Sequence, residues 1–295
     1  MKENTTKAVV SAALGNIIWG FSFLFTKIGL AMAPDPNVML AHRFIVATLV
    51  MVVLTLTGKG KISLKGKNWK PLVLLLLMQT LYYVFETYGV LHTNTTIAGL
   101  VLAVVPVVTI GTGALFLREY PTRRQALFCI LPVAGVIIMT VTGQELGVAK
   151  PLGILFLLLT MLVSALFKTV NRKASQEFSP FERTFMVLAN SAAVFSVMGM
   201  ASVDWNIGAF VAPLLHGKYL ISILCLSLLC SIAANMLVNY ASARMSVFKV
   251  SSFGSLSTLC SVLVGVIFLR EPMNLALFLG AVLILVGIRQ VTKPK

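Results

Sequence analysis

A single carboxylate, Glu86, lies inside the apolar stretch LYYVFETYG at residues 81–89. On a helix, Gln79, Tyr82, Tyr83 and Glu86 fall on one face, because side chains three or four positions apart lie above one another. A charge that faces lipid costs several kcal/mol, so this face should point into a helical bundle. A carboxylate placed there among aromatic rings could bind a cationic group, carry a proton or pair with a basic residue.

Two cations are expected at a similar depth to Glu86, namely Lys27 and Arg43, near the ends of the first two apolar runs. An ion pair between Glu86 and either of them would be a structural lock or an outer gate. A carboxylate that lines a cavity and binds a substrate is the second interpretation, and a solvated vestibule residue is the third. The first two are compatible, since a gate can itself be an ion pair.

Aromatic residues follow the first apolar run at helical spacing, with Trp19 one turn before Phe23. Such a stripe packs against neighbouring helices in many membrane proteins. Together with Tyr82, Tyr83 and Glu86, it could also hold an amine or a quaternary ammonium group through cation–π contacts and charge. Packing and binding both remain open for these side chains.

Two amides, Asn235 and Asn239, lie one helical turn apart in a later apolar run. They could hydrogen-bond a substrate inside a cavity. They could equally form a polar contact between helices, which is common in membrane bundles.

The composition indicates a multi-span membrane protein, because 58% of the 295 residues are apolar and 11% are charged. Soluble domains carry about 25% charged residues. Runs of about twenty apolar residues can cross a bilayer as helices. The expected all-α integral membrane fold has ten such helices, at 8–31, 36–57, 71–91, 95–117, 123–142, 151–172, 181–201, 217–240, 246–269 and 273–290.

Basic residues fall in the gaps between these runs. With the N-terminus inside, 19 of the 24 Lys and Arg residues lie in inner segments. This excess predicts a multi-pass protein of the cytoplasmic (cell) membrane with both termini cytoplasmic. The net charge of +15 therefore reflects membrane topology, and no nucleic-acid partner is expected.

The tetrapeptide Phe-Leu-Arg-Glu occurs twice, at 116–119 and at 268–271, which is an offset of 152 residues. The offset predicts two five-helix repeats, 1–146 and 147–295, and an odd number of helices gives them opposite orientations. Inverted repeats are typical of transporters. Glu119 and Glu271, which close the tetrapeptides, are interpreted as partners of nearby arginines or of helix N-termini.

Several motifs together resemble the EamA-type family of the drug/metabolite transporter (DMT) superfamily. They are Trp19-Gly20 in the first run, Arg43 in the second, and Leu-Arg-Glu at the ends of the fourth and ninth runs. The resemblance covers nearly the whole chain and implies ten helices, two five-helix halves and a central cavity. The second half of the chain departs from the family pattern, since Ser164-Ala165 replaces Trp-Gly and no arginine stands where Arg43 would repeat.

The sequence thus predicts a secondary transporter that moves a small polar organic metabolite, such as an amino acid or a related compound, by alternating access. An organic-cation or drug transporter that uses Glu86 and an aromatic cage is the alternative. A membrane-embedded enzyme is the competing class, but metalloprotease and Walker-type motifs are absent from the sequence. Besides substrate and lipid, the expected partners are a coupling proton or an exchange substrate, with no metal or cofactor, in a monomer or a homodimer.

Overall fold

Helices make up all of the regular structure in the computed structural model, which describes every residue except 1, 64, 93–100, 142–149, 270–274 and 294–295. Each segment that the apolar runs predict to be helical overlaps one or more of these helices. The elements are α1 (Lys2–Leu30), α2 (Pro36–Leu56), α3 (Lys70–Leu91), α5 (Val105–Leu117), α6 (Arg123–Phe128), α7 (Ile130–Val141), α8 (Pro151–Ala174), α9 (Pro180–Ala201), α10 (Ile207–Val211), η1 (Ala212–Leu215), α11 (Gly217–Cys225), η2 (Leu226–Ala233), α12 (Ala234–Ser242), α13 (Val247–Ser252), α14 (Gly254–Leu269) and α15 (Leu275–Thr292).

Five continuous helical stretches of the described chain are long and apolar enough to cross a bilayer. A bilayer core of about 30 Å needs about twenty residues at 1.5 Å per residue. The chain is therefore a multi-pass membrane protein. The five stretches are 6–30, 36–56, 151–174, 180–201 and 217–242.

The helices begin where the sequence offers a capping group. The Asp35 side chain accepts a hydrogen bond from the Asn37 backbone N–H at 2.8 Å, and Pro36 opens α2. Ser179 and Glu182 form a reciprocal capping box at the start of α9. Such caps satisfy N–H groups that have no partner inside the helix, so they fix where each helix starts.

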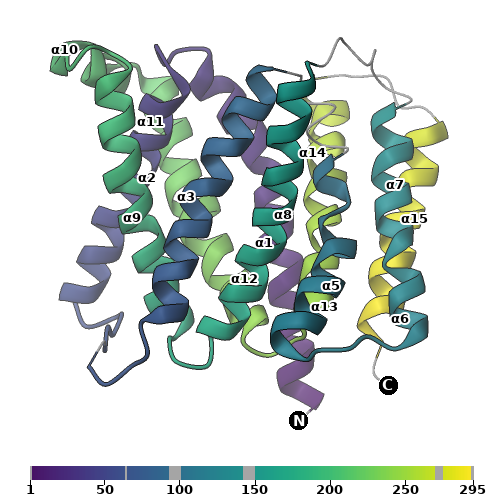
Figure 1. Cartoon of the computed structure of the whole chain (residues 1–295). Coiled ribbons are helices and arrows are strands. Elements are labelled where there is room, and N and C mark those ends of the chain that lie inside the picture. Colours follow the sequence, from purple (N-terminus) through teal and green to yellow (C-terminus); the bar gives the residue numbers. More distant parts are fainter. Residues whose placement is uncertain (1, 64, 93–100, 142–149, 270–274, 294–295) are drawn as a thin grey trace.

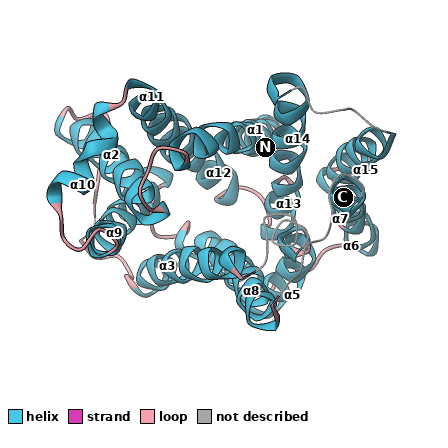
Figure 2. Cartoon of the chain, turned by 90° about the horizontal axis from the view of Figure 1, so that it is seen from above, coloured by secondary structure: helices cyan, strands magenta, loops and turns pink. Residues whose placement is uncertain are grey.

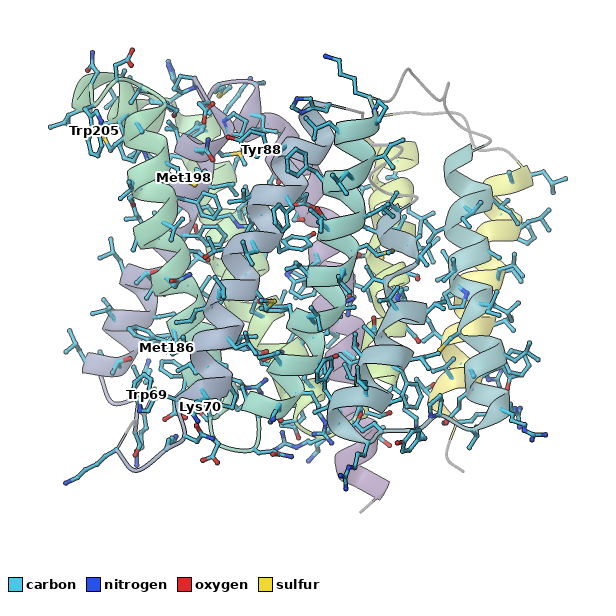
Figure 3. All side chains as sticks on the ribbon, viewed as in Figure 1. Trp69, Lys70, Tyr88, Met186, Met198 and Trp205 are labelled. Atoms are coloured by element: carbon cyan, nitrogen blue, oxygen red, sulfur yellow. The ribbon has the colours of Figure 1, made fainter. Side chains whose placement is uncertain are left out.

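The helices run roughly side by side, and both chain ends lie at the same end of the bundle (Figure 1). Trp69 lies at that end and Trp205 at the opposite end (Figure 3). Both side chains are exposed. Tryptophan favours the two membrane–water interfaces, so these residues mark the two limits of the membrane-embedded part.

Helices distant in sequence form the main contacts of the bundle. Helix α3 packs on α8, α2 packs on α9, and α1 packs on both α12 and α14. Helices α7 and α15 pair with each other at one edge of the bundle (Figure 2). The two helices approach each other closely at Gly135. A Cβ atom at this position would lie 2.6 Å from the Gly280 carbonyl oxygen, so there is room for glycine only.

One helix changes its winding near its middle. Residues 226–233 form a π-helical segment, η2, between α11 and α12. Its Ser227 and Ser231 side chains are buried, and the segment packs on α1 and α2. π-Helical turns often occur at functional sites, so the polar groups around this segment are candidates for a functional site.

Candidate functional site

Glu86 lies beside a tyrosine of its own helix. The Tyr82 hydroxyl donates a hydrogen bond of 2.8 Å to the Glu86 carboxylate, Oε1. The spacing of four residues that places them on one face of α3 is the one the sequence predicted. Both side chains are half-buried, and so is Gln79, one turn before Tyr83.

Tyr83 connects this face to helices α2 and α9. Its ring packs edge-on against Tyr82, with ring centroids 5.3 Å apart. It also packs against Phe44 of α2 at 5.6 Å and against Phe195 of α9 at 5.5 Å. Edge-to-face contacts at these distances are favourable, so the rings hold the polar face of α3 in a defined position.

Arg43 lies close enough to interact electrostatically with both Glu86 and Tyr83. No salt bridge to Glu86 occurs among the side chains that the structure describes, which include Arg43. The side chain of Lys27 lies outside the described residues, so the second predicted ion pair is not assessed. Opposite charges thus lie near each other without direct contact.

The π-helical segment holds Arg43 in place. The Arg43 Nε donates to the Ser231 hydroxyl at 2.7 Å, and the Ser227 hydroxyl donates to the Arg43 carbonyl at 2.8 Å. The guanidinium carbon lies 5.4 Å from the centroid of the Phe44 ring. Among the described residues, the one side-chain hydrogen bond of Arg43 is the one that its Nε donates to Ser231.

Trp19 reaches the same segment from α1. Its indole N–H donates to the Cys230 carbonyl at 2.9 Å, and the Cys230 thiol lies 3.6 Å from the Ile18 carbonyl. A π-helix leaves carbonyl groups without the usual α-helical partner, and the indole satisfies one of them. The ring of Phe23, the other aromatic residue predicted here, lies outside the described side chains.

The two predicted amides of α12 have different environments. Asn235 is half-buried and donates to the Ser231 carbonyl of its own helix at 2.8 Å. Asn239 is buried and binds other helices, since its Nδ2 donates to the Thr184 hydroxyl at 2.9 Å. Asn235 therefore lies next to Ser231 and Arg43, whereas Asn239 belongs to a separate cluster.

That separate cluster surrounds Arg183 of α9, which is fully buried. Its amino groups donate to the Asn171 carbonyl and Oδ1 at 3.1 and 2.6 Å, and to the Asn239 carbonyl at 2.7 Å. Asn171 also donates to the Asn239 Oδ1 at 2.8 Å. The cluster joins α8, α9 and α12 without a carboxylate. Arg43 would repeat near Val187 in the second half of the chain, and Arg183 lies one turn before that position.

A second polar group closes the end of the bundle that carries the termini. The Glu119 carboxylate binds Arg172 at 2.9 Å and accepts the Val247 backbone N–H at 2.7 Å. The helix N-terminus among its expected partners is thus found, at the start of α13, but the arginine is Arg172 and not the neighbouring Arg118. Glu271 lies outside the described residues.

No group of three or more metal-ligating side chains occurs in the described part of the chain. One pocket of the described chain lies between α1, α9 and α12, and none of the predicted cavity residues lines it. The structure thus brings together Trp19, Arg43, Tyr82, Tyr83, Glu86 and Asn235 around α3 and η2, and places Asn239 elsewhere.

Comparison with known proteins gives this arrangement a family. The model of the EamA-like transporter family matches residues 6–141 and again 151–292. An uncharacterized transporter of Bacillus subtilis (strain 168), YcxC, is 32% identical over 98% of this chain and 93% of its own length. An uncharacterized transporter of Archaeoglobus fulgidus is 23% identical over 98% of this chain and all of its own length.

One solved crystal structure has the same fold. Its TM-score is 0.80 at 15% identity, over 97% of this chain and 96% of that one. At that identity the likeness concerns the fold alone. The family match, by contrast, extends over most of the sequence and occurs in both halves, so the chain belongs to the EamA-like transporter family.

Proposed function

We propose that this protein is a secondary transporter of the cytoplasmic membrane that moves small zwitterionic metabolites, such as amino acids, by alternating access. One observation carries the substrate class. Arg43 and Glu86 interact electrostatically, yet each is held by its own hydroxyl partner and the two form no salt bridge.

A zwitterion matches both charges at once. Its carboxylate can take the two amino groups of Arg43, which favours planar, two-point binding of carboxylates. Its ammonium group can bind the Glu86 carboxylate. Opposite unit charges attract by about 4 kcal/mol at 4 Å for an effective dielectric constant of about 20, so a ligand that brings a partner charge to each of these groups is favoured.

A purely cationic substrate is the second candidate. The Tyr82 and Tyr83 rings beside Glu86 favour it, since aromatic faces attract cations. Such a ligand would leave the Arg43 charge unpaired and near a second cation. The zwitterion is therefore the better match to the described charges.

Alternating access requires two exchangeable halves, and we assign these to 1–146 and 147–295 as inverted repeats of five helices each. The twofold match of the family model supports this division. The helix contacts support it as well, since α1 packs on α12 and α14 while α8 packs on α3 and α5, as exchange of the halves requires. The pairs α2–α9 and α7–α15 each join equivalent helices of the two halves.

The inner gate of this mechanism is the pair of polar clusters near the chain ends. The Arg183 cluster joins α8, α9 and α12, and Glu119 joins the end of α5 to α8 and α13. Both must part before a cavity can open on that side. Since inner segments carry most of the basic residues, this side is cytoplasmic.

Transport is tested in liposomes that contain the purified protein and a trapped pool of amino acids. Uptake of labelled amino acids by exchange, absent from protein-free liposomes, is the expected result. If no amino acid or other small metabolite crosses the membrane, the proposal that this protein is a transporter is wrong. If amines cross and amino acids do not, the cationic alternative replaces the zwitterion.

Topology is tested with single cysteines in place of Lys65 and Asp204, which lie in loops at opposite ends of the bundle. In intact cells an impermeant thiol reagent should label the Asp204 position and leave the Lys65 position unlabelled until the cells are opened. Labelling of both positions in intact cells, or of Lys65 alone, contradicts the proposed orientation.

A further inference from the structure

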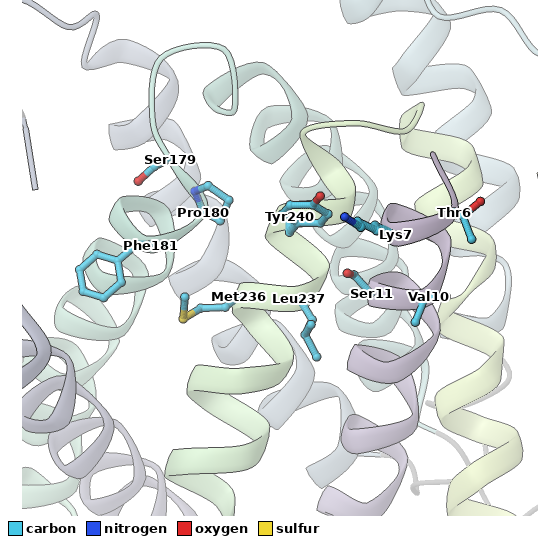
Figure 4. Close-up of a pocket in the computed structure, with 10 residues that line it drawn as sticks. All are labelled: Thr6, Lys7, Val10, Ser11, Ser179, Pro180, Phe181, Met236, Leu237 and Tyr240. Carbon is cyan, nitrogen blue, oxygen red and sulfur yellow. The ribbon is translucent and has the colours of Figure 1, made fainter. Parts of the chain in front are cut away.

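A pocket of about 650 Å³ lies between α1, α9 and α12, at the end of the bundle that carries both termini (Figure 4). Most of its wall is apolar, and this part is formed by Val10, Pro180, Phe181, Met236 and Leu237. The remaining lining residues are Thr6, Lys7, Ser11, Ser179 and Tyr240, which bring hydroxyl groups and a cation.

The pocket opens toward the membrane along α1. Val10 is 49% exposed, and Leu14 and Phe21 farther along the same helix are also exposed. Apolar side chains exposed along one helix of a membrane bundle face lipid. The pocket is thus a groove on the outside of the bundle, and Asn239 is not among the residues of α12 that line it.

Two basic residues lie beside Tyr240, which lines the groove: Lys7, which also lines it, and Arg244, which contacts the Tyr240 ring. Lys7 and Tyr240 lie next to each other in the close-up (Figure 4). The Arg244 guanidinium carbon lies 3.7 Å from the centroid of the Tyr240 ring, and its Nη1 donates to the Tyr240 carbonyl at 3.2 Å. Two basic side chains and several hydroxyl groups therefore lie beside an apolar trough.

We propose that this groove binds an anionic phospholipid, with the phosphate at Lys7 and Arg244 and an acyl chain along Val10 and Leu237. Charge complementarity selects this occupant, because an apolar trough with a basic mouth fits a molecule with an anionic head and an apolar tail. Basic sites between membrane helices are known to bind such headgroups. The inference does not depend on the substrate proposed above.

The bound lipid would act on the polar cluster behind the groove. Helices α9 and α12 line the groove, and the same two helices carry Arg183 and Asn239. A chain wedged along α1, α9 and α12 holds these helices together and so stabilises the Arg183 cluster. Anionic lipid should therefore raise the thermal stability of the folded protein by mass action.

The test compares phosphatidylglycerol with phosphatidylcholine of the same acyl chains, added to the delipidated protein in detergent. Thermal unfolding and native mass spectrometry should show stabilisation and retained lipid for phosphatidylglycerol only. The double variant Lys7→Gln/Arg244→Gln should bind it about tenfold more weakly or worse, since each basic residue contributes about 1 kcal/mol. Arg123→Gln/Lys173→Gln removes the same charge from exposed sites outside the groove and should bind normally.

A second pair of variants tests the trough without changing the charge. Val10→Trp fills the groove and should weaken phosphatidylglycerol binding, whereas Leu14→Trp, one turn away and exposed, should not. Equal stabilisation by phosphatidylcholine, or equal loss in both charge variants, overturns the proposal. Full stabilisation by glycerol phosphate alone would also overturn it, because the basic residues would then bind a free phosphate. Crosslinked dimers through a cysteine at Val10 would overturn it as well, because a second copy of the chain would then cover the groove.

Discussion

Arg43 and Arg183 lie in α2 and α9, the second helix of each of the two segments that match the family model, but their surroundings differ. Arg183 is fully buried, and several amide and carbonyl oxygens of Asn171 and Asn239 accept its hydrogen bonds. Arg43 is half-buried and gives one described side-chain hydrogen bond, to Ser231. A buried cation whose two terminal amino groups are hydrogen-bonded to other helices holds those helices together, whereas a half-buried cation with one described partner near a carboxylate can take a ligand.

The largest expected effect is on stability, from Arg183→Met. The change removes the donor of the buried Asn171 Oδ1 and one of the donors to the Asn171 and Asn239 carbonyl groups, and each unsatisfied buried group costs about 1–3 kcal/mol. We expect a loss of roughly 2–4 kcal/mol, measured as thermal unfolding in detergent. Arg183→Lys keeps the charge but not the forked donors, so its unfolding temperature should lie between those of the parent protein and Arg183→Met. An unchanged unfolding temperature in Arg183→Met would show that the cluster is not structural.

Arg43→Gln should have the opposite profile. We expect the unfolding temperature to stay near that of the parent protein, because a glutamine can still reach Ser231. Amino-acid affinity should fall about tenfold or more, which equals about 1.4 kcal/mol or more of binding free energy. Titration calorimetry with the amino acid identified in the liposome assay measures this. Normal affinity with reduced stability would make Arg43 a structural residue like Arg183.

Glu86→Gln keeps the shape of the side chain and removes its charge. We expect binding of the amino acid to weaken about tenfold, while the matching carboxylic acid without an ammonium group binds no worse than before. If Glu86 carries a coupling proton instead, exchange persists and pH-driven accumulation disappears. Reduced stability with normal affinity and normal pH dependence would make Glu86 part of an ion pair alone.

The smallest effect is expected from Tyr82→Phe. The change removes one hydroxyl that orients the Glu86 carboxylate, and such a hydrogen bond contributes about 0.5–1.5 kcal/mol. Affinity should fall by about two- to tenfold with unchanged stability. Tyr88→Phe, on an exposed position of the same helix, is the matched control. A larger loss than in Glu86→Gln would contradict the supporting role of Tyr82.

The helices and one face of the site were predictable from local sequence. Apolar runs and capping residues such as Asp35 fix where helices form, because both act over a few neighbouring residues. The side-by-side placement of Tyr82, Tyr83 and Glu86 follows from helical periodicity alone. The same reasoning could not decide whether Glu86 pairs with Arg43, because that depends on how α2 and α3 pack.

The Arg183 cluster was missed for the same reason. Its members come from three helices, and Asn239 is 56 residues from Arg183 in sequence. Arg183 lies near the start of an apolar run, where an arginine is usually a surface charge at the membrane boundary. The one available signal was the unusual polarity of 182–190, which contains Glu182, Arg183 and Asn190. That polarity indicated a span that is less apolar than the others, but it did not identify the residues that Arg183 contacts.

The π-helical segment at 226–233 determines how sequence differences among relatives should be interpreted. A π-turn holds one more residue than the α-helical turn it replaces, whereas one extra residue in a regular α-helix would rotate everything beyond it by about 100°. Because the π-turn absorbs that residue, a relative that lacks one residue here would have a regular helix and a single gap in its alignment, and matching residues beyond the gap would still face the same way. A relative of equal length with a regular α-helix at this place would differ, since its counterpart of Asn239 would be rotated away from its counterpart of Arg183. The local winding, and not the identity of the amides alone, would then tell which relatives share this site.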